Sequence, residues 1–432
     1  MFARLRKRLQ FALFCILHRR SLAAQQKWQS NHLRRLVQYA YHNVPMWRTV
    51  LSEKDIGPDS IRSIGDLSKI PVTDKQAYLG KMLEEYTDNS RPSLTNWFVT
   101  SGTSGMPFTF RMSDHARDPA YIDFGSLRFL WWLGEPISRL SSINFARIKI
   151  RAPSSEHRLF IPVADFLQNP REILTRIAQF KPEILSTYPS LLVEIARIVE
   201  NQQMTTRFQV RFVLSIGETL APSVRQYVSD ILKCEIYDRY GFEEVSAVGV
   251  ECAKHDGFHI NTESLIVEIV DESGESLAPG KYGRIVVTDL FNYGMPFIRY
   301  DSGDRGTMTY EPCACGLRSP RIWVKGRYSS FLEFPQRRFH HLEFDAAMDG
   351  FMNSVLQYQI VKRSDSEICA RIVPGPAFDT SFEGKIIESL RKLVGPDIRI
   401  AVESVSTLPI VQTGKSRIVA DETTSDKTVS RE

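Results

Sequence analysis

Acidic side chains are missing from the first 52 residues of this 432-residue chain, which carry ten lysines and arginines and no aspartate or glutamate. The whole chain has a formal net charge of +5, so the remaining residues are slightly acidic, with a net charge of −5. Proteins that wrap nucleic acid present basic surface to the phosphates, often interleaved with aromatic side chains. The slightly acidic body has no such stripe, which argues against a nucleic-acid partner.

Long apolar runs are also missing. The N-terminal run Phe11–Leu17 is much shorter than the roughly 20 residues needed to cross a bilayer. His18, Arg19 and Arg20 follow it directly, and no small-residue cleavage site is present, which argues against a secretory signal peptide. We expect residues 1–25 to form a basic amphipathic segment that either packs on the body or touches an anionic membrane surface.

Cysteine is scarce, with six residues in the whole chain. This is too few for a disulfide-stapled scaffold and indicates a reducing compartment in which the thiols are free or bind metal. We therefore predict a cytoplasmic protein, with contact at the inner membrane surface left open by the basic segment. Ordinary contents of hydrophobic (43%) and charged (24%) residues exclude disorder and collagen-like structure.

Hydrophobic periodicity predicts an α/β fold. Residues 22–90 have helical spacing, whereas residues 94–325 alternate helical stretches with strand-like runs such as Phe212–Ile216. After Gly326-Arg327 the pattern changes to short strands around one helix, Glu383–Val394, which is typical of a small α+β lid domain. The predicted organisation is a basic segment (1–25), a large multi-subdomain domain (26–326), a small C-terminal domain (327–420) and a frayed tail (421–432).

One short segment is rich in hydroxyl groups and glycine: Thr100-Ser101-Gly102-Thr103-Ser104-Gly105-Met106-Pro107. Such a loop lets backbone N–H groups and short side-chain donors surround a polyphosphate without steric obstruction. It is not a Walker loop, because the GxxxxGK[ST] pattern is absent. An ordinary Ser/Gly surface loop explains the same residues equally well.

Three further segments contain residue types suited to nucleotide chemistry. Tyr240–Glu244 combines an aromatic ring, a glycine and carboxylates, which can stack on a base and bind Mg²⁺. Arg299–Asp304 presents Asp304 as an acceptor for a ribose diol. Lys415 follows Gly414 and offers a mobile positive charge near a phosphate. Each segment alone is also compatible with loop, core or solvated charge, but their order and spacing are more specific together.

In this order the segments resemble the adenylate-forming, acyl-CoA synthetase-like superfamily, and within it the phenylacetate–CoA ligase family and its capsule-polysaccharide-biosynthesis relatives. The resemblance runs from about Trp28 to Val419 and includes the text Leu36–Pro45 and the adenine-side segment Ser215–Leu220. It implies a phosphate loop, an adenine side, a YGxTE-like motif, a ribose-binding aspartate, a hinge and an adenylation lysine. The corresponding residues are Thr100, Ser101, Gly102, Thr103, Ser104 and Gly105; Gly217 and Glu218; Tyr240, Gly241 and Glu244; Asp304; Arg327; and Lys415.

Three departures from the family pattern stand out. Met106 replaces the lysine of the phosphate loop, and Glu243 replaces a small hydroxyl residue. Residues 328–330, after the hinge arginine, lack the usual acidic residue. Because the hinge governs rotation of the small domain, the thioester-forming step is affected more than adenylation.

Four metal-ligating residues are spaced as Cys252-x6-His259 and Cys313-x-Cys315. Three thiolates and one imidazole suit tetrahedral Zn²⁺, and a site with four protein ligands is structural. His255 is a competing ligand, and four unconnected residues are the alternative to a site. The closely spaced Cys-Ala-Cys favours zinc.

The resemblance implies that ATP, with Mg²⁺ at Glu244, and a small carboxylic acid form an acyl-adenylate and pyrophosphate, and that a thiol such as coenzyme A then accepts the acyl group. Two alternatives are an adenylate-using step in surface-polysaccharide assembly with another acceptor, and a nucleotide-binding scaffold without turnover. Aromatic residues can line an acyl pocket or belong to the core: Tyr121, Phe124, Phe129, Trp131, Trp132 and Tyr188.

Overall fold

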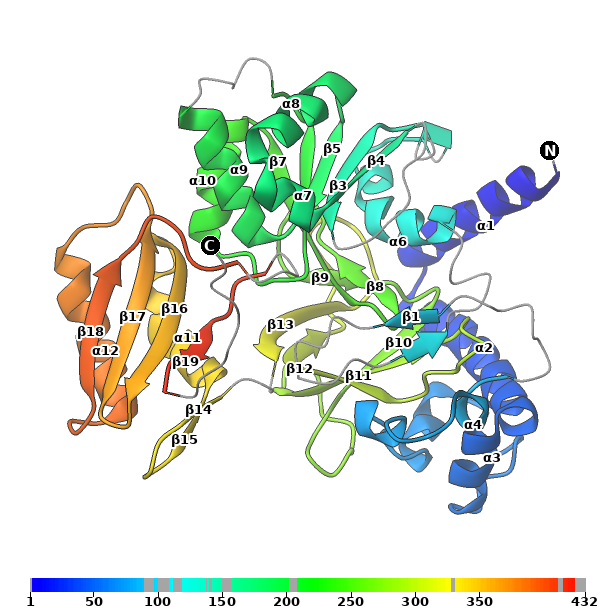
Figure 1. Cartoon of the computed structure of the whole chain (residues 1–432). Helices are drawn as coiled ribbons and strands as arrows, with labels where there is room; N and C mark the ends of the chain where they lie inside the picture. The colour runs from blue at the N-terminus through cyan, green and yellow to red at the C-terminus, as the bar shows by residue number, and fades with distance from the viewer. Residues whose placement is uncertain are drawn as a thin grey trace. The chain divides into compact units, whose positions relative to one another are not determined.

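The computed structural model of the chain divides into two compact units, each built from two separate stretches of sequence (Figure 1). Unit 1 comprises Met1–Ser142 and Tyr237–Gly326, and unit 2 comprises Ile143–Ile236 and Arg327–Glu432. The structure describes residues 2–88, 97–99, 109–111, 119–136, 138–139, 142–149, 157–201, 208–327, 331–410 and 415–423; side chains are described for all of these except 2–10, 97–99, 119–124 and 327. Among these residues, no helix combines the length and apolarity needed to cross a membrane.

Unit 1 combines N-terminal helices with a mainly antiparallel set of strands. Its helices are α1 (Phe2–Arg19), α2 (Leu22–Asn43), α3 (Pro45–Ser52), α4 (Leu83–Tyr86) and α6 (Pro119–Trp132). The main strands follow the spatial order β10-β11-β12-β13-β9-β8-β7, and β1 (Trp97–Val99) pairs with β2 (Thr109–Arg111). Their bounds are β7 (Glu235–Phe242), β8 (Ser246–Val250), β9 (Phe258–Ile260), β10 (Leu265–Val270), β11 (Gly283–Asp289), β12 (Tyr300–Thr309) and β13 (Arg321–Arg327).

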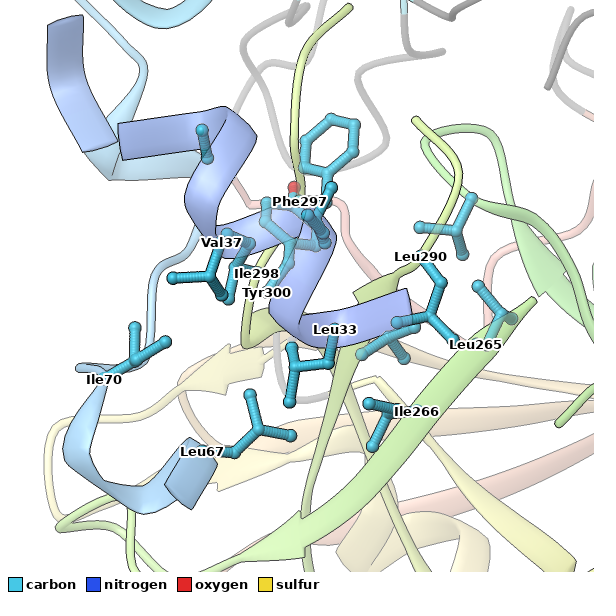
Figure 2. Close-up of a cluster of buried hydrophobic side chains, with 14 of the residues drawn as sticks. Leu33, Val37, Leu67, Ile70, Leu265, Ile266, Leu290, Phe297, Ile298 and Tyr300 are labelled. Atoms are coloured by element: carbon cyan, nitrogen blue, oxygen red, sulfur yellow. The ribbon is translucent and has the colours of Figure 1, made fainter. Parts of the chain in front are cut away.

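The core of unit 1 lies between helix α2 and these strands. Leu33, Leu36 and Val37 are fully buried and repeat at the three- and four-residue spacing that places them on one helix face. They contribute to one apolar cluster with Leu265 and Ile266 of β10 (Figure 2). The helix ends before Pro45, which begins α3, as the Val44-Pro45 pair predicts.

Unit 2 begins with a parallel set of strands in the order β6-β5-β3-β4, as expected for strands joined by crossover helices. Strand β6 coincides with the predicted strand over residues 212–216, and its uniformly buried side chains are typical of a parallel sheet. The elements of this lobe are β3 (Phe145–Lys149), β4 (Arg158–Pro162), α7 (Val163–Gln168), α8 (Pro170–Phe180), β5 (Ile184–Thr187), α9 (Pro189–Asn201), β6 (Phe212–Ile216) and α10 (Pro222–Leu232).

The C-terminal lobe of unit 2 has the predicted α+β texture and an apolar core of its own, formed by residues between Leu332 and Val419. Four strands follow the order β18-β17-β16-β19, and a short hairpin joins β14 to β15. Mixed α/β architecture with a C-terminal sheet subdomain confirms the predicted fold class. The elements are β14 (Phe331–Glu333), β15 (Arg338–His340), α11 (His341–Met348), β16 (Val355–Ser364), β17 (Glu367–Pro374), α12 (Ser381–Val394), β18 (Arg399–Ser404) and β19 (Val419–Asp421).

Candidate functional site

Tyr240 and Asp304, predicted from two motifs, meet in unit 1. The Tyr240 hydroxyl donates a hydrogen bond to Asp304 Oδ2 at 2.8 Å and lies 3.4 Å from Ser302 Oγ. The Ser302 hydroxyl also accepts the Asp304 backbone N–H and donates to the Ile285 carbonyl. Tyr240 of β7 therefore orients the Asp304 carboxylate, while Ser302 of β12 holds the Asp304 backbone. Ser302 was not among the predicted site residues, although it stands two positions before Asp304.

Gly241 lies near the end of β7, and Glu244 lies in the turn that joins β7 to β8. A Cβ atom at Gly241 would lie 2.0 Å from the Ser246 carbonyl oxygen, so no larger residue fits there without moving the backbone. The mostly buried Glu244 accepts a hydrogen bond from the Tyr300 hydroxyl at 3.1 Å. A carboxylate held in this way is the type of oxygen ligand that Mg²⁺ uses.

Gly217 and Lys415 meet in unit 2, together with Tyr188. Gly217 has a φ of +74°, and a Cβ atom there would lie 2.9 Å from the Tyr188 ring and 3.4 Å from Lys415 Cε. Lys415 Nζ lies 5.6 Å from the centroid of the same ring, within cation–π range. Only glycine lets the backbone at position 217 pass this close to the Tyr188 ring, which explains why a glycine stands at this position of the predicted adenine-side segment.

Glu218 connects this cluster to helix α9 and to the C-terminal lobe. Its Oε2 accepts the Ser190 N–H at 2.9 Å, and its Oε1 accepts the Ser416 N–H at 2.7 Å. Enclosure of the carboxylate raises the pKa of Glu218 above its ordinary value, although these donors and Lys415 oppose the shift. The Ser190 N–H belongs to the first turn of α9, where the helix dipole favours a carboxylate.

The structure does not describe the side chains of the other predicted nucleotide-binding residues. The predicted phosphate loop Thr100–Gly105 lies outside the described residues. Arg327 is the last residue of β13, and its side chain is not described. The hinge departures at 328–330 also lie outside the described residues.

The four predicted zinc ligands converge in unit 1. The ligand atoms of Cys252, His259, Cys313 and Cys315 all lie within 4.8 Å of one another, and we call these residues the Cys/His cluster. Cys252 Sγ lies 3.8 Å from Cys313 Sγ, and Cys315 Sγ lies 3.3 Å from His259 Nε2. His255, the competing ligand, contacts the Glu251 carboxylate at 3.0 Å and is not in the cluster.

These distances fit a tetrahedral zinc site. Zn–S bonds of about 2.3 Å and Zn–N bonds of about 2.0 Å place two sulfurs about 3.8 Å apart, and a sulfur and a nitrogen about 3.5 Å apart. His259 directs Nε2 into the cluster, while its Nδ1 lies 2.9 Å from Ser319 Oγ. A partner on the second ring nitrogen is what orients zinc-bound histidines.

The aromatic residues suggested for an acyl pocket are found in different surroundings. Phe129 is fully buried and stacks on Tyr237 with ring centroids 4.3 Å apart. Trp132 packs edge-on against His259 beside the Cys/His cluster. Tyr188 lies against Gly217 and Lys415, as described above. The Arg19 guanidinium lies over the Trp131 ring, 4.6 Å from its centroid. The side chains of Tyr121 and Phe124 lie outside the described set.

A buried ionic network that the sequence did not predict joins three separate segments of unit 1. Arg128 of helix α6 pairs with Glu263, and His18 of helix α1 lies 2.7 Å from the same carboxylate. Burial opposes ionisation of Glu263, but Arg128 and His18 together outweigh burial and hold its pKa below the usual range. A single arginine within the apolar stretch Leu127–Leu133 was the available signal.

A family model described as AMP-binding enzyme matches residues 156–290. Phenylacetate-coenzyme A ligase of Thermus thermophilus is 26% identical over 364 residues, which cover 79% of this chain and 78% of that protein. Protein CapK of Staphylococcus aureus is 19% identical over 407 residues, covering 90% of this chain and 87% of that protein. The solved structure of 2-hydroxyisobutyryl-CoA ligase in the postadenylation state with R3-HIB-AMP has a TM-score of 0.75 at 18% identity, covering 94% of this chain and 91% of that one.

Sequence and fold together therefore have the features of an adenylate-forming enzyme, which confirms the resemblance inferred from the motifs. The chain is similar to phenylacetate-coenzyme A ligases and, at lower identity, to Protein CapK.

Proposed function

We propose that this protein is an ATP-dependent acid–thiol ligase. In the first half-reaction a carboxylate oxygen of the acid attacks the α-phosphorus of ATP, the bond to the β-phosphate breaks, and pyrophosphate leaves. In the second, a coenzyme A thiolate attacks the acyl carbon and AMP leaves. The observation that carries the proposal is the cluster in unit 2, where Lys415 lies beside Gly217 and Tyr188 while Glu218 accepts the neighbouring Ser416 N–H.

Each residue has a role in the first half-reaction. Asp304, oriented by the Tyr240 hydroxyl, accepts hydrogen bonds from the ribose, and the Tyr240 ring lies against adenine. The backbone donors of the loop 100–105 hold the phosphates. Lys415 neutralises charge that develops between the carboxylate and the α-phosphate, so it acts mainly in the transition state. Glu244 would hold Mg²⁺, whose chemistry is neutralisation of the phosphate charge.

We assign Zn²⁺ to the Cys/His cluster as a structural ion. The support is the sulfur and nitrogen spacing, the Ser319 contact to His259 and the burial of Cys252 and Cys313. Four protein ligands leave no open coordination position, so this ion takes no part in the proposed reaction. Metal analysis of protein purified without chelator tests the assignment, with about one zinc per chain as the expected result.

We test adenylation by acid-dependent ATP–pyrophosphate exchange, using pooled aryl, fatty and hydroxy acids. Because phenylacetate-coenzyme A ligases are among the similar proteins, arylacetic acids are the first substrates to try. Lys415→Ala is expected to lower exchange about 10²- to 10³-fold with little change in the KM for ATP. Lys392→Ala, at an exposed lysine of α12, is the matched control and is expected to keep full activity. Exchange that is equally strong in Lys415→Ala would refute the assigned role.

The similarity to Protein CapK, which spans 90% of the chain, favours one second candidate. In that case the acyl-adenylate is formed in the same way and a different acceptor in surface-polysaccharide assembly takes the acyl group. AMP release that depends on coenzyme A distinguishes the two acceptors. A scaffold without turnover predicts no exchange with any acid and no effect of Lys415→Ala. We also propose a cytoplasmic location.

A further inference from the structure

Helix α1 docks on unit 1 through one of its faces. Phe14 and His18 are almost completely buried, and the Phe14 ring packs against Trp28 of α2 at 6.2 Å. His18 contacts Glu263 through its ring, and its carbonyl accepts the Arg318 N–H at 3.0 Å. Side-chain and backbone contacts to several segments therefore fix this face of α1 beside α6 (Figure 1).

The opposite face of α1 is apolar and exposed. Leu13 is 58% exposed and Ile16 is 48% exposed, although both stand in a helix that is anchored on its other side. At about 100° per residue, these two side chains lie about 60° apart and roughly opposite His18. In the sequence, Leu5 and Leu9 precede Leu13 at four-residue intervals, which is the spacing of one helix face.

The charged residues of the N-terminal segment that contains this face are all basic. The segment up to Arg20 contains six lysines and arginines, and no acidic residue occurs before Glu53. A second copy of the chain would bring the same positive charge to the face, so self-association there is opposed by repulsion. An anionic bilayer matches both the basic charge and the apolar face. Its headgroups attract the basic side chains, and the boundary of its acyl chains accepts the apolar side chains.

We propose that α1 is an interfacial anchor whose Leu13–Ile16 face enters the headgroup region of an anionic membrane while its His18 face stays docked on unit 1. This goes beyond the proposed ligase reaction, because it places the enzyme at a lipid surface by a helix that contributes no residue to the candidate site. Since the docked face is held by internal contacts, the helix is already oriented for binding.

The test is co-sedimentation of the full chain with phosphatidylcholine vesicles that contain or lack phosphatidylglycerol. Wild type is expected to bind the anionic vesicles only, and less at high salt. The double variant Leu13→Glu, Ile16→Glu is expected to lose at least about tenfold in binding, because it removes apolar contact and adds like charge. A double variant at two other exposed apolar residues, Met82→Glu and Leu167→Glu, is the matched control and is expected to bind normally.

ATP–pyrophosphate exchange in solution, measured on the same proteins, checks that the variants are folded without depending on vesicles. Absence of wild-type binding to anionic vesicles would overturn the proposal, as would equal binding to neutral vesicles. Unchanged binding by the α1 variant would also overturn it. If size-exclusion chromatography shows a wild-type dimer that the α1 variant dissociates, the face is an interface between copies and the membrane proposal is wrong.

Discussion

Removing the Glu218 carboxylate should slow acyl-adenylate formation while leaving the second half-reaction intact. Glu218 accepts two backbone N–H groups, one from Ser190 at the start of α9 and one from Ser416 next to Lys415. The first bond joins elements of one lobe, whereas the second holds the Lys415 segment against Gly217. Glu218→Ala removes both acceptors, so the variant loosens the segment without touching the lysine itself.

The size of the effect follows from the second bond. A hydrogen bond to a charged group contributes about 1.5–3 kcal/mol, and the half-buried setting of Ser416 favours the lower end. A loss of about 1.4 kcal/mol lowers the ratio of docked to undocked Lys415 segment about tenfold. We therefore expect a fall of up to about tenfold in the rate of adenylation, well short of the effect of Lys415→Ala. Glu218→Gln keeps one carbonyl acceptor and should have an intermediate effect.

The assay separates the half-reactions. Single-turnover formation of acyl-adenylate measures the first, and transfer from purified acyl-adenylate to coenzyme A measures the second. Hydrogen exchange at the Ser416 amide reports whether the segment is loosened. Glu172→Ala, at an exposed glutamate in the first turn of α8, is the control and should change none of these values. An equal fall in both half-reactions, or an unchanged adenylation rate with faster Ser416 exchange, would refute the reasoning.

Three further predictions concern unit 1. Tyr240→Phe removes the hydroxyl that orients Asp304. We expect the KM for ATP to rise about tenfold with little change in kcat, measured by pyrophosphate exchange at varied ATP concentration. An unchanged KM would contradict this prediction. Removal of the proposed zinc by a chelator should speed hydrogen exchange in α1. The reason is that Arg318, just beyond the Cys/His cluster, donates its N–H to the His18 carbonyl of that helix. Equal protection of α1 with and without chelator would contradict this prediction. Burial raises the pKa of Asp289 from 3.8 to about 6, so ionisation costs the folded state stability as pH rises through that range. Urea unfolding should therefore find Asp289→Asn more stable by up to about 3 kcal/mol at pH 8 and similar to wild type near pH 4, and a gain that is equal at both pH values contradicts it.

Elements with strong local signals could be predicted closely from the sequence. The strand over 212–216 is a short run in which every residue but Ser215 is apolar, and it lies between Arg211 and Gly217; its ends match the structure. The predicted helix over 383–394 begins two residues earlier in the structure, at Ser381, because caps and turns are weaker signals than periodicity. The Cys/His cluster was predictable because soft ligands are rare in this chain and two of them are separated by one residue.

Contacts between distant segments were not predictable in the same way. Nothing near Tyr188 in the sequence indicates that its ring meets Gly217 and Lys415, since that contact depends on how the C-terminal lobe docks. The aromatic residues after Gly125 also carried an ambiguous signal, because core packing and a ligand pocket favour the same residue types. Phe129 proves to be stacked in the core on Tyr237.

The C-terminal lobe is joined to the preceding lobe of unit 2 partly by hydrogen bonds. Its apolar cluster is formed by its own residues, from Leu332 to Val419. Polar bonds join it to the preceding lobe at Glu218–Ser416 and at Ser223, whose hydroxyl donates to the Val355 carbonyl and whose N–H donates to Met352. These three hydrogen bonds, at about 1–2 kcal/mol each, amount to a few kcal/mol, which differential ligand binding can supply. The proposed two-step reaction needs an attachment of this strength if Lys415 is held in place for adenylation and then withdrawn for thioester formation.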